Sequence, residues 1–192
     1  MTVFHLVRHA ANDLAERVLC GRKLDVPLNA HGRRQAEALA RRLAQEPINQ
    51  IISSPRKRAR QTAEPIAATL NLPFAIAAQL DEHDAGIWSG QSFANLARDP
   101  RWRLWNERRH EVRPPAGESM AELQTRILRY LDQLALRYPG DTVVLVTHAE
   151  PIRAALLYDR GLPLKDFWCV DVPLACAATI VREPAPLSAV PA

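Results

Sequence analysis

The sequence predicts an α/β protein with a mostly parallel sheet that helices cover on both faces. Short apolar, β-branched runs alternate with longer segments in which apolar residues recur at helical spacing. Two of these runs, over 3–7 and 142–146, end directly on polar residues, as buried strands of parallel sheets do. A chain of 192 residues, of which 47% are hydrophobic, fits one domain or a core with one insertion.

The first half of the chain is expected to form two strand–helix units. A buried strand over 3–7 precedes a helix that Asn29 caps. A short strand over 51–52 precedes a second helix over about 56–70. Pro65 lies inside this second helix, and we expect it to kink or split the helix.

The second half returns to the sheet after an irregular stretch over 80–117, in which residues 91–110 are weakly helical. A capping box over 119–122 begins the next helix. The elements expected after that helix are a strand over 142–146, a helix over about 150–160, and strands near 168–172 and 176–182.

We expect residues 1–182 to form a single domain, with about 85–117 as a helical insertion. Residues 183–192 contain three prolines, and this composition favours a disordered tail.

Composition and cysteine usage exclude several classes of protein. Cys20, Cys169 and Cys176 are an odd number without a C-x-x-C pair, so no disulfide framework or zinc ribbon is expected. No apolar run has the length of a membrane span, and the N-terminus lacks the charge pattern of a signal peptide. We therefore expect a cytoplasmic protein that has no membrane partner.

The formal net charge is +4, and only 3 of the 25 basic residues are lysines. Arginine is a fixed-charge fork that suits phosphate and carboxylate groups. The stretch 98–113 holds six arginines, three acids and two tryptophans. This stretch is open to three interpretations: a nucleic-acid patch, a solvated helical insertion whose tryptophans pack inward, or a lid. Because its arginines alternate with acids, we expect no nucleic-acid partner.

Reactive side chains follow three of the expected strands. Ligands of parallel sheets bind beyond the carboxyl ends of the strands. The pairs at these ends are Arg8-His9, Ser53-Ser54 and Thr147-His148. The organisation alone therefore predicts one cleft that holds two histidines.

These residue types suit phosphoryl transfer. His9 can act as a nucleophile near neutral pH, and attack on phosphorus needs cations around the phosphoryl oxygens. Arg8 is adjacent in sequence, and Arg58 lies at the start of a helix, where backbone amides also favour anions. Glu82 can protonate the leaving oxygen as a general acid, although Asp81 and Asp84 compete for this role.

Five motifs, spread over about residues 3–182, carry a resemblance to a known family. They are Leu6–Asn12, Asp25–Ala36, Ser53–Ala63, Leu80–Gly90, and the pair Gly117–Ser119 with Val146–His148. In order and spacing they resemble the motifs of the histidine phosphatase (phosphoglycerate mutase-like) superfamily, small phosphatase branch. The resemblance implies that the insertion over about 85–117 covers the active site as a lid.

The resemblance also implies a function: a phosphomonoesterase that hydrolyses a small phosphorylated metabolite through phosphohistidine, without a metal or an organic cofactor. His9 is the implied nucleophile, Glu82 the acid and then the base, and Arg8, Arg58 and His148 the groups that hold the phosphoryl group. The further residues expected in the phosphate site are Asn12, Arg22 and Ala149. The oligomeric state stays open, with a homodimer among the options.

Six positions depart from the family pattern. The family has glycine at the positions of Ala10 and Ala149, often threonine at that of Asn12, asparagine at that of Ala15, an aromatic residue at that of Ala85 and glutamate at that of Ser89. Glycine can be needed for a positive φ or for close approach of a ligand. The alternatives are therefore a catalytically silent phosphate-binding protein on the same fold, or a mutase of the phosphoglycerate type. The sequence does not choose among sugar phosphates, ribazole phosphate, phosphoglycerates and phosphoproteins as substrates.

Overall fold

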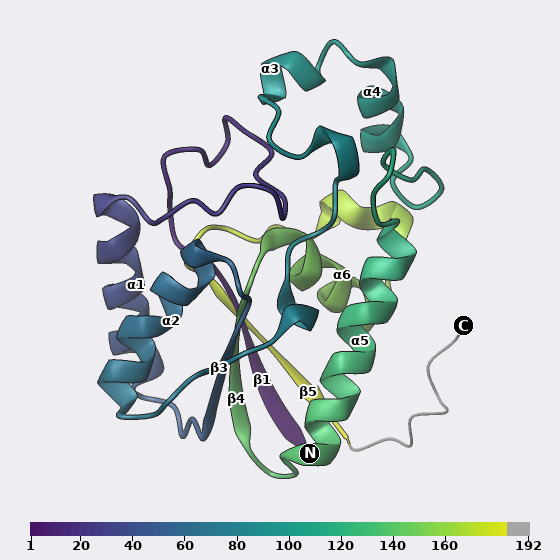
Figure 1. Ribbon diagram of the computed structural model, residues 1–192. Coiled ribbons are helices and arrows are strands. Elements are labelled where there is room, and N and C mark those ends of the chain that lie inside the picture. The colour runs from purple at the N-terminus through teal and green to yellow at the C-terminus, as the bar shows by residue number, and fades with distance from the viewer. Residues whose placement is uncertain (184–192) are drawn as a thin grey trace.

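A five-stranded sheet in the order β3-β2-β4-β1-β5 forms the centre of the computed structural model, which describes residues 1–183 (Figure 1). The strands are β1 (Thr2–Arg8), β2 (Gln50–Ser53), β3 (Ala75–Ile76), β4 (Thr142–Thr147) and β5 (Ala177–Arg182). Three neighbouring pairs are parallel, and β5 pairs antiparallel with β1. The predicted fold class is therefore confirmed. The predicted disordered tail lies, from residue 184 on, outside the described residues.

Helices cover both faces of this sheet (Figure 1). One layer contains α1 (Ala30–Leu43) and α2 (Lys57–Leu70), and the other contains α5 (Met120–Arg137) and α6 (Ala149–Asp159). Alternate residues of β4 divide between two cores, because successive side chains of a strand point to opposite faces. Val144 and Val146 pack with the α1–α2 layer, and Val143 and Leu145 pack with the α5–α6 layer.

Local signals set the helix starts. The Asn29 side chain accepts a hydrogen bond from the Gly32 amide at 2.8 Å, and a full capping box of Ser119 and Glu122 begins α5. Of the two outcomes expected for Pro65, a kink or a split, the split does not occur, because α2 is continuous over Lys57–Leu70. Ala63 and Ile66 are buried on either side of Pro65, so packing of this face outweighs the missing hydrogen bond.

The strand expected near 168–172 is absent, which is a second correction. A 3₁₀ helix, η3 (Leu164–Cys169), occupies the start of this segment, and an irregular stretch follows it. Val170 and Val172 are buried, as alternation predicts. Their carbonyls, however, accept hydrogen bonds from the side chains of Arg153 and Arg8 instead of a neighbouring strand.

The segment between β3 and α5 lies beyond the carboxyl ends of the strands (Figure 1). It carries two 3₁₀ helices, η1 (Ala78–Leu80) and η2 (Gly86–Trp88), and two short α-helices, α3 (Phe93–Leu96) and α4 (Pro100–Glu107). The weakly helical stretch predicted over 91–110 therefore corresponds to α3 and α4. Among residues 1–183, no helix has the length and apolar character that crossing a membrane requires.

Candidate active site

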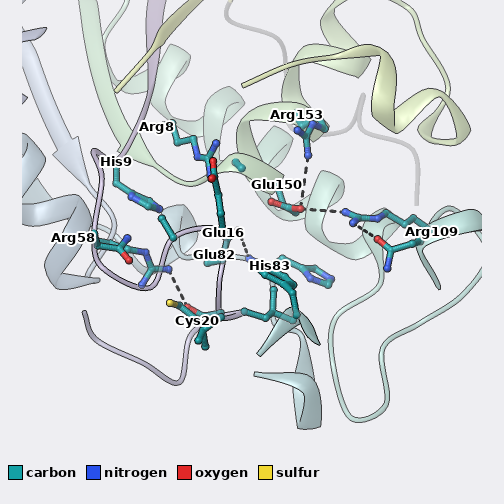
Figure 2. Close-up of a pocket in the computed structure, with 18 of the residues that line it drawn as sticks. Arg8, His9, Glu16, Cys20, Arg58, Glu82, His83, Arg109, Glu150 and Arg153 are labelled. Atoms are coloured by element: carbon teal, nitrogen blue, oxygen red, sulfur yellow. Dashed lines mark hydrogen bonds and ion pairs between the residues drawn. The ribbon is translucent and has the colours of Figure 1, made fainter. Parts of the chain in front are cut away.

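A pocket of about 410 Å³ opens at the carboxyl ends of β1 and β4, below α3 and α4. Elements that are distant in sequence meet at its walls: the end of β1, the first turns of α2 and α6, and the loop that carries Glu82. Six of the predicted site residues line it: Arg8, His9, Asn12, Arg58, Glu82 and Ala149 (Figure 2).

His9 is buried and held in one orientation. Its Nδ1–H donates to the backbone carbonyl of Ala10 at 2.9 Å. Burial, together with the positive charges of Arg58 and Arg8, lowers the pKa of His9 to about 3. A neutral ring that donates from Nδ1 carries its lone pair on Nε2. Nε2 has no hydrogen-bond partner within residues 1–183 and is not fully buried, so this lone pair is available to a ligand.

The alanines that replace the family's glycines cause no backbone strain. Among the described residues, neither Ala10 nor Ala149 has a positive φ. The Ala10 amide donates to Thr62 Oγ1 at 3.0 Å, and its carbonyl orients His9 as a glycine carbonyl would. The two alanines therefore give no backbone reason to expect a catalytically silent protein.

Two arginines beside His9 lack carboxylate partners. Arg58 is only 2% exposed, and its guanidinium donates to the carbonyls of Gly21 and Leu24 at 3.0 and 3.2 Å. Arg8 Nη1 donates to the carbonyl of Val172 at 2.6 Å. Neither arginine forms a salt bridge with any residue in the described part of the chain. Two uncompensated cations at the wall of a pocket favour an anionic ligand.

His148 completes the pair of histidines that the strand ends predicted. Its ring lies 5.2 Å from the ring of His9, measured between centroids. The side chain is fully buried behind the pocket wall, and its Nε2 forms a hydrogen bond with Ser54 Oγ at 2.7 Å. Burial and the nearby Arg58 charge lower the pKa of His148 well below its ordinary value.

Glu82 has the environment of a proton donor. Its Oε1 accepts a hydrogen bond from the His83 amide at 2.8 Å, and its Oε2 lies 3.8 Å from His148 Nδ1. Burial and the negative charge of Glu150 raise the pKa of Glu82 above its ordinary value, and Arg58 opposes part of this rise. A carboxyl group with a raised pKa keeps its proton closer to neutral pH.

Asn12 and Arg22 were both expected to add a contact to the phosphate, and the structure places them differently. Asn12 lines the pocket, and its Oδ1 accepts from the Leu14 amide at 3.0 Å. Arg22 does not line the pocket. Its guanidinium instead donates to the carbonyl of Glu82 at 2.7 Å and to Glu118 at 2.9 Å.

Several pocket residues were not identified from the sequence. They are His83, Trp105, Arg109, Glu150, Arg153 and Trp168. Glu150 follows His148 by two positions, so the strand-end rule could have indicated it. Arg109 and Trp105 were part of the stretch 98–113, but both are buried, at 6% and 2% exposure. The interpretation in which the tryptophans of this stretch pack inward holds for Trp105, whereas Arg109 is not a solvated residue.

Known proteins share this fold and these motifs. Residues 4–187 match the family model described as histidine phosphatase superfamily (branch 1). The chain is 35% identical over 180 residues to phosphoserine phosphatase 1 of Hydrogenobacter thermophilus, a match that covers 93% of this chain and 85% of the relative. It aligns with the structure of Bacillus stearothermophilus YhfR at a TM-score of 0.88 and 26% identity, covering 95% of this chain and 92% of that chain. A mycobacterial glucosyl-3-phosphoglycerate phosphatase gives a TM-score of 0.83 at 26% identity, covering 92% and 88%.

The fold and the site together define the protein as a phosphatase with an α/β fold. The chain belongs to the histidine phosphatase superfamily, branch 1, as the five motifs predicted.

Proposed function

We propose that the protein hydrolyses phosphomonoesters of small metabolites through a phosphohistidine formed on His9. The observation that carries this proposal is the position of His9, a neutral imidazole with a free Nε2 beside the unpaired cations Arg8 and Arg58 (Figure 2). Arg8 and Arg58 hold the phosphoryl oxygens on which negative charge spreads in the transition state, and His148 lies behind this wall. Asn12 and Ala149 line the same end of the pocket.

The first step transfers the phosphoryl group to the enzyme. Nε2 of His9 attacks phosphorus, the ester P–O bond breaks, and the Glu82 carboxyl gives its proton to the leaving oxygen. In the second step, a water molecule attacks the phosphorus of phosphohistidine, and the Glu82 carboxylate takes the water proton. The P–N bond breaks, and inorganic phosphate leaves.

The insertion over about 85–117 is proposed as a lid that selects the substrate. Its contribution to the pocket wall supports this role, because Phe93, Trp102, Trp105 and Arg109 all line the cavity. A volume of about 410 Å³ lies within the range of small-molecule sites. The cysteines of the described chain, Cys20, Cys169 and Cys176, are all free, which supports a cytoplasmic location.

Turnover of p-nitrophenyl phosphate, with an acid quench to trap phosphoenzyme, tests the proposal. The wild type should form an acid-labile phosphoenzyme and should be unaffected by a chelator. His9→Ala should abolish both signals, whereas the exposed His31 on α1 offers a matched control, His31→Ala, that keeps them. Full turnover by folded His9→Ala would contradict the proposal.

A further inference from the structure

A cluster of three charged side chains lies in the pocket wall across from Arg8, His9 and Arg58 (Figure 2). We call Arg109, Glu150 and Arg153 the distal triad. Oε1 of Glu150 lies 3.1 Å from Arg109 Nη1 and 3.8 Å from Arg153 Nη1. All three residues line the same cavity as Arg8, His9 and Arg58, so one small molecule can contact both groups of residues.

Aromatic rings hold Arg109 rigidly in this triad. Its guanidinium carbon lies 3.9 Å from the centre of the Trp105 ring and 4.3 Å from that of Trp168. Nη2 donates to Asn106 Oδ1 at 2.7 Å. Removing a charged pair from water is costly, and apolar side chains would stabilise the fold as well. An ion cluster at a pocket wall, with Arg109 buried and Glu150 and Arg153 half-buried, therefore indicates recognition of a ligand.

Two atoms of the triad are free to bind a ligand. Oε1 of Glu150 faces both arginines, but its Oε2 receives no hydrogen bond from residues 1–183 and is not buried. Arg153 Nε donates to the carbonyl of Val170 at 2.7 Å, whereas Nη2 has no hydrogen-bond partner in the same range and is not buried. The wall therefore presents one anionic acceptor beside one cationic donor.

We propose that Glu150 and Arg153 form a subsite for a zwitterionic group, and that the substrate is an O-phosphorylated α-amino acid. The substrate ammonium donates to Oε2 of Glu150, and Nη2 of Arg153 donates to the substrate carboxylate. Arg109 fixes Glu150 from behind. This inference rests on the proposed phosphatase function, because the phosphate ester must lie at His9.

The free acceptor on Glu150 separates this substrate class from phosphorylated hydroxy acids. A hydroxyl can also donate to Oε2, but an ammonium adds a full positive charge beside the carboxylate, which a hydroxyl lacks. A substrate without the carboxylate leaves Arg153 Nη2 unpaired. Both charged groups of the substrate are therefore needed for full affinity.

A series of four phosphomonoesters tests the subsite. O-phosphoserine carries both charged groups, 3-phosphoglycerate has a hydroxyl in place of the ammonium, O-phosphoethanolamine lacks the carboxylate, and glycerol 3-phosphate lacks both. The wild type should show a kcat/KM for O-phosphoserine that exceeds that of each analogue by about tenfold or more.

Two substitutions test which side chain binds the substrate ammonium and which binds the substrate carboxylate. Glu150→Gln should reduce O-phosphoserine turnover to the level of 3-phosphoglycerate, and Arg153→Gln should reduce it to the level of O-phosphoethanolamine. Each variant is compared by the ratio of its kcat/KM for O-phosphoserine to its kcat/KM for glycerol 3-phosphate at one pH, because an effect on Glu82 changes both values together. Glu107 and Arg103 are exposed on α4, and Glu107→Gln and Arg103→Gln are the matched controls.

Equal kcat/KM values for O-phosphoserine and its analogues, in a wild type that turns over p-nitrophenyl phosphate, overturn the subsite alone. Absence of any phosphoenzyme overturns the proposed function instead. In that case, calorimetry with folded His9→Ala still tests the subsite, because O-phosphoserine should bind about tenfold more tightly than O-phosphoethanolamine. If Glu150→Gln does not fold, Arg153→Gln and the wild-type series decide the question.

Discussion

Arg22 donates a hydrogen bond from Nε to the backbone carbonyl of Glu82 at 2.7 Å, and so holds the acid-bearing loop from behind. The same guanidinium donates to Glu118 at 2.9 Å, and Glu118 also accepts from Arg126 at 2.9 Å. The carbonyl of Glu118 is hydrogen-bonded to His83 Nε2 at 2.6 Å. The side chains of Arg22, Glu118 and Arg126 thus hold the loop of Glu82 without lining the pocket.

Arg22→Gln is expected to displace the general acid while the nucleophile stays in place. Turnover of glycerol 3-phosphate, whose leaving group needs a proton, should fall about 10- to 100-fold in kcat. Phosphoenzyme formation from p-nitrophenyl phosphate, measured as the initial burst of p-nitrophenol, should change by less than about threefold, because this leaving group departs unprotonated. Arg17 is exposed in the same loop, and Arg17→Gln is the matched control. An equal loss in the p-nitrophenol burst rate and in glycerol 3-phosphate turnover would mean that Arg22 acts on the whole fold.

The pH profile of Glu150→Gln should report the coupling between the two pocket carboxylates. Glu82 must be protonated in the first step, so kcat/KM for an alkyl phosphate falls as the pH rises through the pKa of Glu82. The Glu150 charge is one cause of the raised pKa of Glu82. Removing this charge lowers that pKa, and the alkaline fall in kcat/KM should move to lower pH. An unchanged profile would show that burial alone sets the pKa.

The free energy of unfolding should depend on pH through the protonation of His9. The folded protein keeps His9 neutral down to about pH 3, whereas the unfolded chain takes up its proton near pH 6.5. The unfolded state therefore binds more protons in this window, and the stabilisation is complete above pH 6.5 and is lost as the pH falls. His9 should contribute a slope to the free energy of unfolding that approaches about 1.4 kcal/mol per pH unit as the pH falls from 6.5 towards 5.

Denaturant titrations between about pH 5 and 6.5, above the range in which most carboxylates titrate, measure this slope. His9→Ala should reduce the slope, whatever its effect on absolute stability. His31→Ala should leave it unchanged, since His31 is exposed. A slope that is identical in all three proteins would contradict the assignment of a neutral His9.

The positions of three site residues could be predicted from the sequence because one rule places all of them. Arg8, His9 and His148 stand at the carboxyl ends of parallel strands, which meet at one edge of the sheet. The distal triad follows no such rule. Arg109 comes from the insertion and Arg153 from α6, and tertiary contacts with Glu150 and the aromatic rings of Trp105 and Trp168 bring them together.

The missing strand near 168–172 and the unbroken helix α2 have a common physical origin, since tertiary contacts outweighed the local signal in both. Val170 and Val172 alternate with polar residues as a strand requires, yet arginine side chains take the carbonyls that a strand would pair. Pro65 lacks the amide that a helix uses, yet Ala63 and Ile66 are buried on either side of it.

Ala10→Gly restores the glycine of the family pattern. This substitution should lower the free energy of unfolding and should not increase the activity. Ala10 is fully buried against Leu28 and Ala36, so losing its methyl group costs about 0.8 kcal/mol. The added freedom of the unfolded chain costs about 0.4–1 kcal/mol more, because Ala10 adopts its conformation without a positive φ. Thermal unfolding should therefore begin at a lower temperature, with kcat for p-nitrophenyl phosphate within about threefold of wild type. A tenfold or greater gain in kcat would instead mean that the Ala10 methyl obstructs the phosphoryl group, and would restore the case for a weakened catalyst.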